Sequence, residues 1–212
     1  MIESKKNIVV LATTNAGKVR ELAAPLQNFG FEVVGLEAFQ GLGDVEETGR
    51  TFEANALLKA RTVADATGYV TVADDSGLEV EALGGAPGIY SARYGDDWPF
   101  VAGESRDARN IRKLLTALAE VPQDKRCARF VCCMAVCVPR GKELVVRGLW
   151  EGRILQQAQG HNGFGYDPVF FDPALGRSAA LLTCEEKGAI SHRGKALRQL
   201  LAHWSDFLES KA

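Results

Sequence analysis

A long hydrophobic run is missing from this sequence. No stretch of about 18 consecutive apolar residues, the length that a membrane-spanning helix needs, occurs in the chain. The apolar run at residues 8–12 has only five members, too few for the core of a secretory signal peptide. We therefore expect a cytoplasmic protein that has no membrane partner.

Excess positive charge is missing as well. Lys and Arg number 25 against 27 Asp and Glu, which gives a formal net charge of −2. A general nucleic-acid binder would be biased toward positive charge, so no nucleic-acid partner is expected. A chain with this balance exerts no long-range attraction on anions. An anionic substrate would therefore need local cations or a metal.

Cysteine pairs and metal-spaced histidines are also lacking. The five cysteines form no C-x-x-C motif, and an odd number without an export signal is typical of reduced cytosolic thiols. Most of them fall in one apolar run, which indicates small buried residues of a strand. None of the three histidines has a second ligand at zinc-site spacing. The cysteines are Cys127, Cys132, Cys133, Cys137 and Cys184.

The first half of the chain alternates between two periodicities. Apolar residues are 46% and charged residues 25% of the whole, as in ordinary globular proteins. Short β-branched runs predict strands at residues 8–12, 31–35 and 69–73. Amphipathic patterns predict helices over residues 17–26 and 51–67. Strands that alternate with helices are typical of an α/β fold.

The second half is richer in predicted strands. A helix is expected over residues 106–119. Strands at 126–138 and 143–150 are separated by a Pro-Arg-Gly-Lys turn, which predicts a hairpin. Strand-rich sequence continues to about residue 171, and one final helix is expected over residues 191–208.

The expected fold is therefore α/β, with a mixed, twisted sheet and helices on its faces. No Pro-, Gly- or Ser-rich linker divides the sequence cleanly. Residues 1–212 are accordingly expected to form a single domain, in two lobes with a cleft between them.

The segment between the first strand and the first helix is a candidate phosphate site. It reads Thr13, Thr14, Asn15, Ala16, Gly17 and Lys18. Backbone N–H groups at a helix start favour anions, and a lysine there adds a full charge. The segment is not a Walker A motif, because Ala12 and Val19 occupy positions where that motif needs Gly and Ser or Thr. The alternative interpretation is an ordinary capped helix start.

Two pairs of acidic residues are candidate metal ligands. Glu46 and Glu47 lie in a predicted loop, and Asp74 and Asp75 follow the strand expected to end at Ala73. Ligands of α/β proteins bind near the carboxyl ends of strands, and adjacent carboxylates repel each other unless a cation or a proton is present. Oxygen ligands suit Mg²⁺ or Mn²⁺ better than zinc. The alternative is that these acids are solvated turn residues.

A glycine-rich loop at residues 160–168 is a candidate site for a flat ligand. Phe164 and Tyr166 offer ring faces, Asp167 offers an acceptor, and the glycines allow close approach to the backbone. The loop is not a dinucleotide fingerprint, because it does not join a strand to a helix in a βαβ unit. The alternative is a glycine-rich β turn.

Positive charge gathers a little further along the chain. Lys187, His192, Arg193 and Lys195 form a dense local patch, which suits phosphates or carbonyl oxygens. The alternative is a charged helix start, with Ser191 as its cap.

Taken in order, six blocks of this sequence closely resemble the inosine triphosphate pyrophosphatase family, in its bacterial XTP/dITP diphosphatase branch. The resemblance extends from about residue 8 to about residue 201. The blocks are residues 13–18, 47–60, 73–78, 84–94, 163–168 and 191–194. It implies an elongated, two-lobed α/β fold with a central active-site cleft, usually as a homodimer. It also implies Mg²⁺-dependent hydrolysis of deaminated purine nucleoside triphosphates such as dITP, ITP and XTP to the monophosphate and pyrophosphate.

The resemblance also assigns roles to residues. Asp75 would be the general base and a metal ligand, and the second ligand would come from the 46–47 pair. Of these two, Glu46 is preferred over Glu47, although one sequence leaves the register open. Lys18 and Lys59 would bind the phosphates together with the backbone of residues 13–18.

Substrate contacts are implied outside the phosphate site too. Ser76 would touch the substrate beside Asp75, since the Gly-x-Ser-x-Gly elbow of a serine nucleophile is absent. The base pocket would consist of Phe164, Gly165, Tyr166 and Asp167. The 6-oxo purine would be read by Lys187, His192 and Arg193.

Two other functions remain open at this point. One is a pyrophosphatase for other altered nucleotides, such as modified pyrimidines, which a substrate panel would distinguish. The other is a non-catalytic nucleotide-binding protein, which would bind ITP with Mg²⁺ but release no pyrophosphate. The presence of Asp75 and the Glu46–Glu47 pair argues against the second.

Overall fold

The computed structural model describes residues 7–39, 41–43 and 45–209, and within them seven strands share one sheet. The order across the sheet is β2-β1-β3-β4-β5-β6-β7. Strand β1 is parallel to β2 and β3, whereas β6 is antiparallel to β5 and β7, so the sheet is mixed as predicted. The strands are β1 Ile8–Leu11, β2 Glu32–Gly35, β3 Val70–Val80, β4 Cys127–Cys137, β5 Glu143–Ile154, β6 Phe170–Asp172 and β7 Arg177–Ser178.

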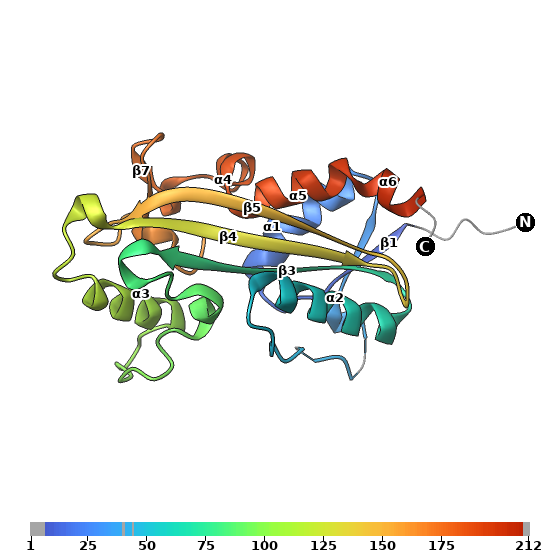
Figure 1. Ribbon diagram of the computed structural model, residues 1–212, viewed down its shortest axis with the longest axis horizontal. Coiled ribbons are helices and arrows are strands. Elements are labelled where there is room, and N and C mark those ends of the chain that lie inside the picture. Colours follow the sequence, from blue (N-terminus) through green and yellow to red (C-terminus); the bar gives the residue numbers. More distant parts are fainter. Residues whose placement is uncertain (1–6, 40, 44, 210–212) are drawn as a thin grey trace, which may run out of the picture. The chain divides into compact units, whose positions relative to one another are not determined.

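Helices flank this sheet, as Figure 1 shows. The α-helices are α1 Ala16–Asn28, α2 Phe52–Thr67, α3 Arg106–Ala117, α4 Cys184–Ile190, α5 His192–Ala202 and α6 Trp204–Glu209. Short 3₁₀ turns are η1 Leu36–Ala38, η2 Glu81–Leu83, η3 Gly88–Arg93, η4 Gln123–Lys125, η5 Asp167–Val169 and η6 Ala179–Leu181. The predicted α/β class with a mixed sheet and flanking helices is therefore confirmed.

Helix α2 begins and ends where its sequence predicts. The Thr51 hydroxyl accepts a hydrogen bond from the Ala54 N–H at 3.1 Å, which satisfies one of the free donors of the first turn. At the other end Gly68 adopts φ 74°, a left-handed conformation that glycine tolerates without steric cost. Both caps hold the helix in a fixed register, and this determines which side chains it buries.

Strand β3 corrects one expectation. We predicted a strand over residues 69–73 with the two aspartates beyond its end, but β3 runs to Val80 and includes both. Asp74 and Asp75 are buried, at 1% and 5% exposure. A strand can contain buried carboxylates only if cations and donors compensate them, and the local residue pattern alone does not reveal those partners.

Two further expectations are also wrong. The predicted helix over residues 191–208 is divided in two, because α5 ends at Ala202, a turn follows at His203, and α6 begins at Trp204. The strand-rich stretch expected up to residue 171 is mostly irregular, and β6 begins only at Phe170. In the segment that leads to the predicted loop of Glu46 and Glu47, residues 40 and 44 lie outside the described residues, as do residues 1–6.

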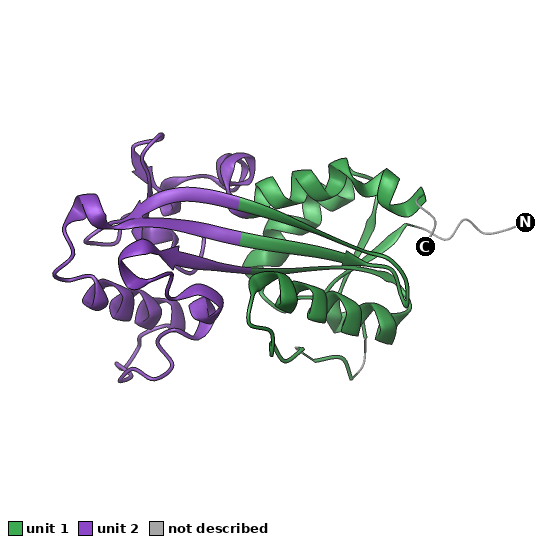
Figure 2. Cartoon of the chain, in the orientation of Figure 1, with its two compact units in different colours: residues 1–75, 132–148, 193–212 green, residues 76–131, 149–192 purple. Residues whose placement is uncertain are grey.

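The chain divides into two compact units (Figure 2). Unit 1 comprises residues 1–75, 132–148 and 193–212, and unit 2 comprises residues 76–131 and 149–192. Strands β3, β4 and β5 contribute residues to both.

Each unit has its own hydrophobic core. In unit 1, α1, α5 and α6 pack against the sheet through apolar residues such as Leu22, Leu200 and Trp204, all buried to 3% exposure or less. In unit 2, Leu114 of α3 and Leu118, the residue that follows this helix, pack against the apolar residues of β3, β4, β5 and β6. These cores anchor the polar side chains described below.

All five cysteines are free thiols, as the sequence predicts. Burial, followed by the charge of Glu143, raises the pKa of Cys137 to about 12, so this thiol stays protonated. In the part of the chain that the structure describes, no helix has the length and apolar character needed to cross a membrane.

Candidate active site

The candidate site of unit 1 is built on β3. Its aspartates Asp74 and Asp75 are almost fully buried. Successive residues of a strand point to opposite faces, so the two carboxylates have different neighbours. Asp74 accepts from Arg193 and Lys18, whereas Asp75 accepts from Asn55.

Lys59 of α2 joins these acids to the loop before the helix. Its ammonium lies 2.6 Å from Oε1 of Glu47, 2.7 Å from the carbonyl oxygen of Asp74 and 3.8 Å from Oδ1 of Asp75. Lys59 is only 8% exposed. Burial by itself would lower the pKa of Lys59, but the charges of Asp74, Asp75 and Glu47 outweigh it and raise that pKa. The lysine therefore remains a cation in the site.

The buried carboxylate of Asp75 has a raised pKa. Burial, together with the nearby charge of Glu47, raises the pKa of Asp75 to about 6, against the opposing effects of Lys59, Asn55 and Lys18. A carboxylate with a pKa near the working pH accepts a proton more readily than an ordinary one.

Lys18 and its helix start form the second cationic group of unit 1. Asn15 caps α1, its side-chain oxygen accepting from the N–H groups of Gly17 and Lys18 at 2.9 and 3.2 Å. The Lys18 ammonium lies 3.1 Å from Oδ2 of Asp74 and 3.3 Å from its carbonyl oxygen. Thr14, Asn15 and Ala16 are exposed beside it. Residues 13–18 therefore form a capped helix start that also carries a cation, Lys18.

Arg193 belongs to unit 1, whereas Lys187 and His192, the other residues predicted to read the base, belong to unit 2. Its guanidinium donates to Oδ2 of Asp74 at 3.2 Å and to the carboxylate of Glu21. Burial would lower the pKa of Arg193, but Asp74 and Glu21 raise it, so this 3% exposed side chain stays charged. In this structure the Arg193 side chain compensates the charges of Asp74 and Glu21. Its contact with the purine therefore stays a prediction.

The acids of unit 1 suit a divalent cation. Mg²⁺ is bound in proteins by one or two carboxylates and keeps several waters. Glu47 and Asp75 both lie within ion-pair distance of the same Lys59 ammonium, while Glu46 is exposed. The geometry therefore favours Glu47 over Glu46 as the partner of Asp75. Within the described residues, no group of three or more His, Cys, Asp or Glu is arranged to hold a metal.

In unit 2, the predicted base-pocket residues come together around one ion pair. Lys187 lies 2.6 Å from Oδ2 of Asp167, and both side chains are at most 6% exposed. The same carboxylate oxygen accepts the N–H of Phe164 at 2.9 Å, and the Lys187 ammonium lies 4.7 Å from the centre of the Phe164 ring. A cation over an aromatic ring is attracted to its negative face. The loop and α4 are thereby tied to each other.

Other contacts hold this loop from α3 and η3. The Gly165 N–H donates to Asp107 Oδ2 at 2.7 Å, and the Tyr166 hydroxyl donates to the Ser91 carbonyl at 2.8 Å. Tyr166 is buried, so its hydroxyl end is fixed inside unit 2.

His192 is also buried and stacks on Phe130, with ring centres 4.7 Å apart. Ser76, which directly follows Asp75, is half-buried.

Sequence reasoning missed two residues of unit 1. Asn55 is completely buried and contacts Asp75, and Glu21 pairs with Arg193. Asn55 precedes Lys59 by one helical turn, so the spacing alone places the two on one face of α2. That signal was available in the sequence. Glu21 pairs with Arg193, which lies 172 positions further along the chain. No local sequence pattern predicts a contact over that separation.

The fold and unit 1 define an α/β protein that surrounds paired aspartates of a central strand with two lysines and an arginine. The Ham1 family model matches residues 9–203, and the chain belongs to the Ham1 family.

Named relatives and solved structures agree with this assignment. A dITP/XTP pyrophosphatase of Nitratidesulfovibrio vulgaris is 58% identical and aligns over 95% of this chain and 98% of its own. One from Salmonella paratyphi A is 54% identical, over 91% and 95%. The structure of a HAM1 protein from Coxiella burnetii matches with a TM-score of 0.82 and 40% identity, covering 94% of this chain and 98% of that one. A Mycobacterium abscessus nucleoside-triphosphatase / dITP/XTP pyrophosphatase structure matches with a TM-score of 0.71 and 45% identity, over 92% and 98%.

Proposed function

We propose that this protein is a Mg²⁺-dependent nucleoside triphosphate pyrophosphatase that hydrolyses dITP, ITP and XTP to the monophosphate and pyrophosphate. The observation that carries the proposal is the group around Lys59, where Glu47 from a loop and Asp75 from β3 meet one buried ammonium. The names of the relatives support the substrate class. Mn²⁺ is the alternative metal, since it accepts the same oxygen ligands.

The residues of unit 1 divide the chemistry among them. Asp75 takes a proton from water, whose oxygen bonds to the α-phosphorus while the bond from that phosphorus to the bridging oxygen breaks. The ammonium groups of Lys18 and Lys59 compensate the negative charge of the triphosphate. Glu47 and Asp75 would hold Mg²⁺, which when bound stabilises the charge that develops on the leaving pyrophosphate.

Recognition of the base is assigned to unit 2. A 6-oxo purine offers an acceptor where adenine carries a donor, and Lys187 has only donors. An adenine amino group placed against such donors would leave buried groups unpaired, and that mismatch can discriminate by about 10⁴-fold. The Phe164 ring would stack on the base, with Asp167 holding Lys187 in place.

Pyrophosphate release from a nucleotide panel tests the proposal. The panel contains dITP, ITP, XTP, dATP, dTTP and UTP, each with Mg²⁺, with Mn²⁺ and with a chelator. Release from the three deaminated purines alone, and only with metal, is expected. Preferential release from the pyrimidines would point to another altered nucleotide as substrate. Stoichiometric binding of ITP without any release would show a non-catalytic nucleotide-binding protein.

The homodimer, which the family resemblance implies, and the cytoplasmic location, which the sequence led us to expect, stay predictions. Light scattering on the purified full chain would measure its mass against 22.9 kDa for one copy. A mass of one copy would contradict the dimer, and it would leave the hydrolytic proposal untouched.

A further inference from the structure

Asn55 contacts both elements that supply the proposed metal ligands. Its Oδ1 accepts the N–H of Gly49 at 2.8 Å, and its Nδ2 donates to Oδ2 of Asp75 at 3.0 Å. The side chain is 0% exposed. One amide therefore joins the loop that carries Glu47 to the strand that carries Asp75.

The surroundings leave this amide little freedom. A Cβ added at Gly49 would lie 2.5 Å from Asn55 Oδ1 and 2.9 Å from the Ala54 side chain, so the loop approaches α2 as closely as glycine permits. The helix is fixed independently by the Thr51 cap. The Asn55 amide is also oriented by its partners, because only the NH₂ group can donate to a carboxylate and only the oxygen can accept an N–H.

We propose that Asn55 is a positioning residue of the hydrolytic reaction, which holds Asp75 by Oδ2 and the Glu47 loop by the Gly49 N–H. This inference rests on the proposed function. Asp75 has two carboxylate oxygens, and the contact with Asn55 engages Oδ2 while Oδ1 faces Lys59. Oδ1 is then the oxygen presented to water and metal. The side-chain hydrogen bonds of Asn55 go to Asp75 and to the Gly49 N–H, so we place its action through Asp75 and the loop of Glu47.

Two substitutions separate the halves of this role. Asn55→Ala removes both contacts. Asn55→Asp keeps the shape and the acceptor for Gly49, but places a carboxylate against Asp75. Because a displacement of about 1 Å in a reacting group costs on the order of 100-fold, kcat for dITP should fall by about that factor in both variants. The KM for dITP should stay within about threefold, since uniform substrate binding is not touched.

Thr51→Ala is the matched control. It weakens the same end of α2 by removing the cap, but it does not touch Asp75. The unfolding midpoint should fall while kcat stays within about twofold of wild type. If Asn55→Ala and Asn55→Asp lower kcat no more than Thr51→Ala does, the positioning role is wrong.

A second measurement needs no activity at all. In the double variant Asn55→Asp/Asp75→Asn, the donor and acceptor exchange places, and the hydrogen bond can form in reverse. Asn55→Asp alone should lower the unfolding midpoint at pH 8 by roughly 5–10 °C, because it buries an uncompensated charge. The double variant should be more stable than the two single effects predict when added. Strict additivity would show that the two side chains are not coupled, and would overturn the inference.

These tests distinguish the inference from the function on which it rests. If the wild-type protein releases no pyrophosphate from dITP, ITP or XTP, the proposed function fails and the positioning role fails with it, whatever the unfolding data show. If the wild type is active, the Asn55 variants alone decide the inference.

Discussion

The ammonium of Lys59 lies 2.6 Å from Oε1 of Glu47, so a helix residue holds a loop carboxylate beside the acids of β3. The same nitrogen is 2.7 Å from the carbonyl oxygen of Asp74 and 3.8 Å from Oδ1 of Asp75. One buried cation thus compensates several acids that would otherwise repel one another. Loss of this cation should lower both the stability of the folded protein and its catalytic rate.

Lys59→Met tests this directly, because it keeps an apolar stem of similar length and removes the charge. Breaking a buried ion pair typically costs about 3–5 kcal/mol, so the free energy of unfolding should fall by a few kcal/mol at pH 8. The kcat/KM for dITP should fall by at least about 100-fold, since a phosphate-binding charge is also lost. Chemical denaturation and initial-rate kinetics measure the two effects.

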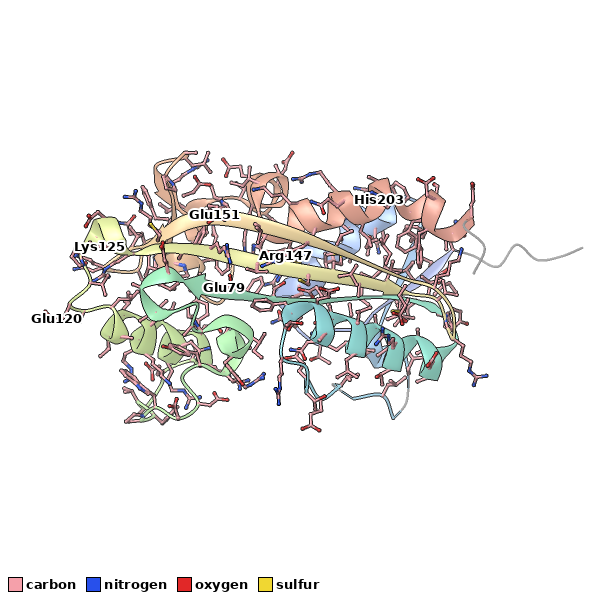
Figure 3. All side chains as sticks on the ribbon, in the orientation of Figure 1. Glu79, Glu120, Lys125, Arg147, Glu151 and His203 are labelled. Carbon is pink, nitrogen blue, oxygen red and sulfur yellow. The ribbon has the colours of Figure 1, made fainter. Side chains whose placement is uncertain are left out.

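Lys125→Met is the control for Lys59→Met. Lys125 is exposed at the surface of unit 2 (Figure 3), so it should change neither quantity beyond error. Wild-type kinetics in Lys59→Met would remove Lys59 from the substrate site.

Glu47 and Glu46 form a natural matched pair for locating the metal ligand. Glu47→Gln should raise the Mg²⁺ concentration for half-maximal activity by about tenfold or more, because a neutral amide is a poorer ligand than a carboxylate. Glu46→Gln changes the adjacent, exposed residue and should shift it less than about twofold. Direct Mn²⁺ binding, measured by electron paramagnetic resonance, should show the same order of the two variants. The reverse order would restore Glu46 as the ligand.

Asp75→Asn should lower activity strongly and yet stabilise the metal-free protein at high pH. The pKa of Asp75 is about 6 in the folded protein, against 3.8 for an ordinary aspartate, because burial disfavours its charge. The folded state thus binds this proton more tightly than the unfolded state does. Stability from this group is therefore present below pH 4 and is lost as the pH rises to 6. Above pH 6 the ionised carboxylate costs on the order of 2–3 kcal/mol, which the asparagine avoids.

The measurement compares denaturation of the wild type and Asp75→Asn across pH in the presence of a chelator. The stability gain of the variant should be full at pH 8 and should shrink toward zero as the pH falls from 6 to 4. Turnover of dITP at pH 8 should meanwhile fall by about 10²–10⁴-fold, the usual contribution of a general base. A gain that grows as the pH falls would contradict the sign of this pKa shift.

Much of the fold was predictable because local residue patterns determine where many of its helices and strands lie. The helix expected over residues 51–67 is found there, between the Thr51 cap and the glycine at residue 68. The length of β3 was not predictable in the same way. Asp74 and Asp75 disfavour a strand locally, and only partners distant in the chain, such as Arg193, stabilise them within it.

The candidate site shows the same division. Lys18, Lys59 and Asp75 could be expected from the order of motifs, and the structure brings them together around β3. The choice between Glu46 and Glu47 was open because adjacent loop residues have no periodicity to separate them. The structure favours Glu47 through its contact with Lys59. Sequence reasoning placed Arg193 with the base, and its contact with Asp74 emerges only in three dimensions.

The base-pocket loop of unit 2 should depend on Asp107. Its Oδ2 accepts the Gly165 N–H at 2.7 Å, between Phe164 and Tyr166. Asp107→Ala removes that acceptor and should loosen the loop that holds the purine. One hydrogen bond to a charged group contributes about 1.5 kcal/mol, so the KM for dITP should rise by about tenfold. The kcat should stay within about twofold, because neither Asp75 nor Glu47 is touched.

Two further variants make this prediction specific. Asp107→Asn keeps an oxygen acceptor without the charge, so its KM should lie between those of the wild type and Asp107→Ala. Glu120→Ala removes another exposed acid of unit 2 (Figure 3) and should leave KM unchanged. Steady-state kinetics with dITP give both constants for all four proteins. An unchanged KM in Asp107→Ala would mean that the remaining contacts of the loop, from Lys187 to Asp167 and from Tyr166 to Ser91, hold it without help from α3.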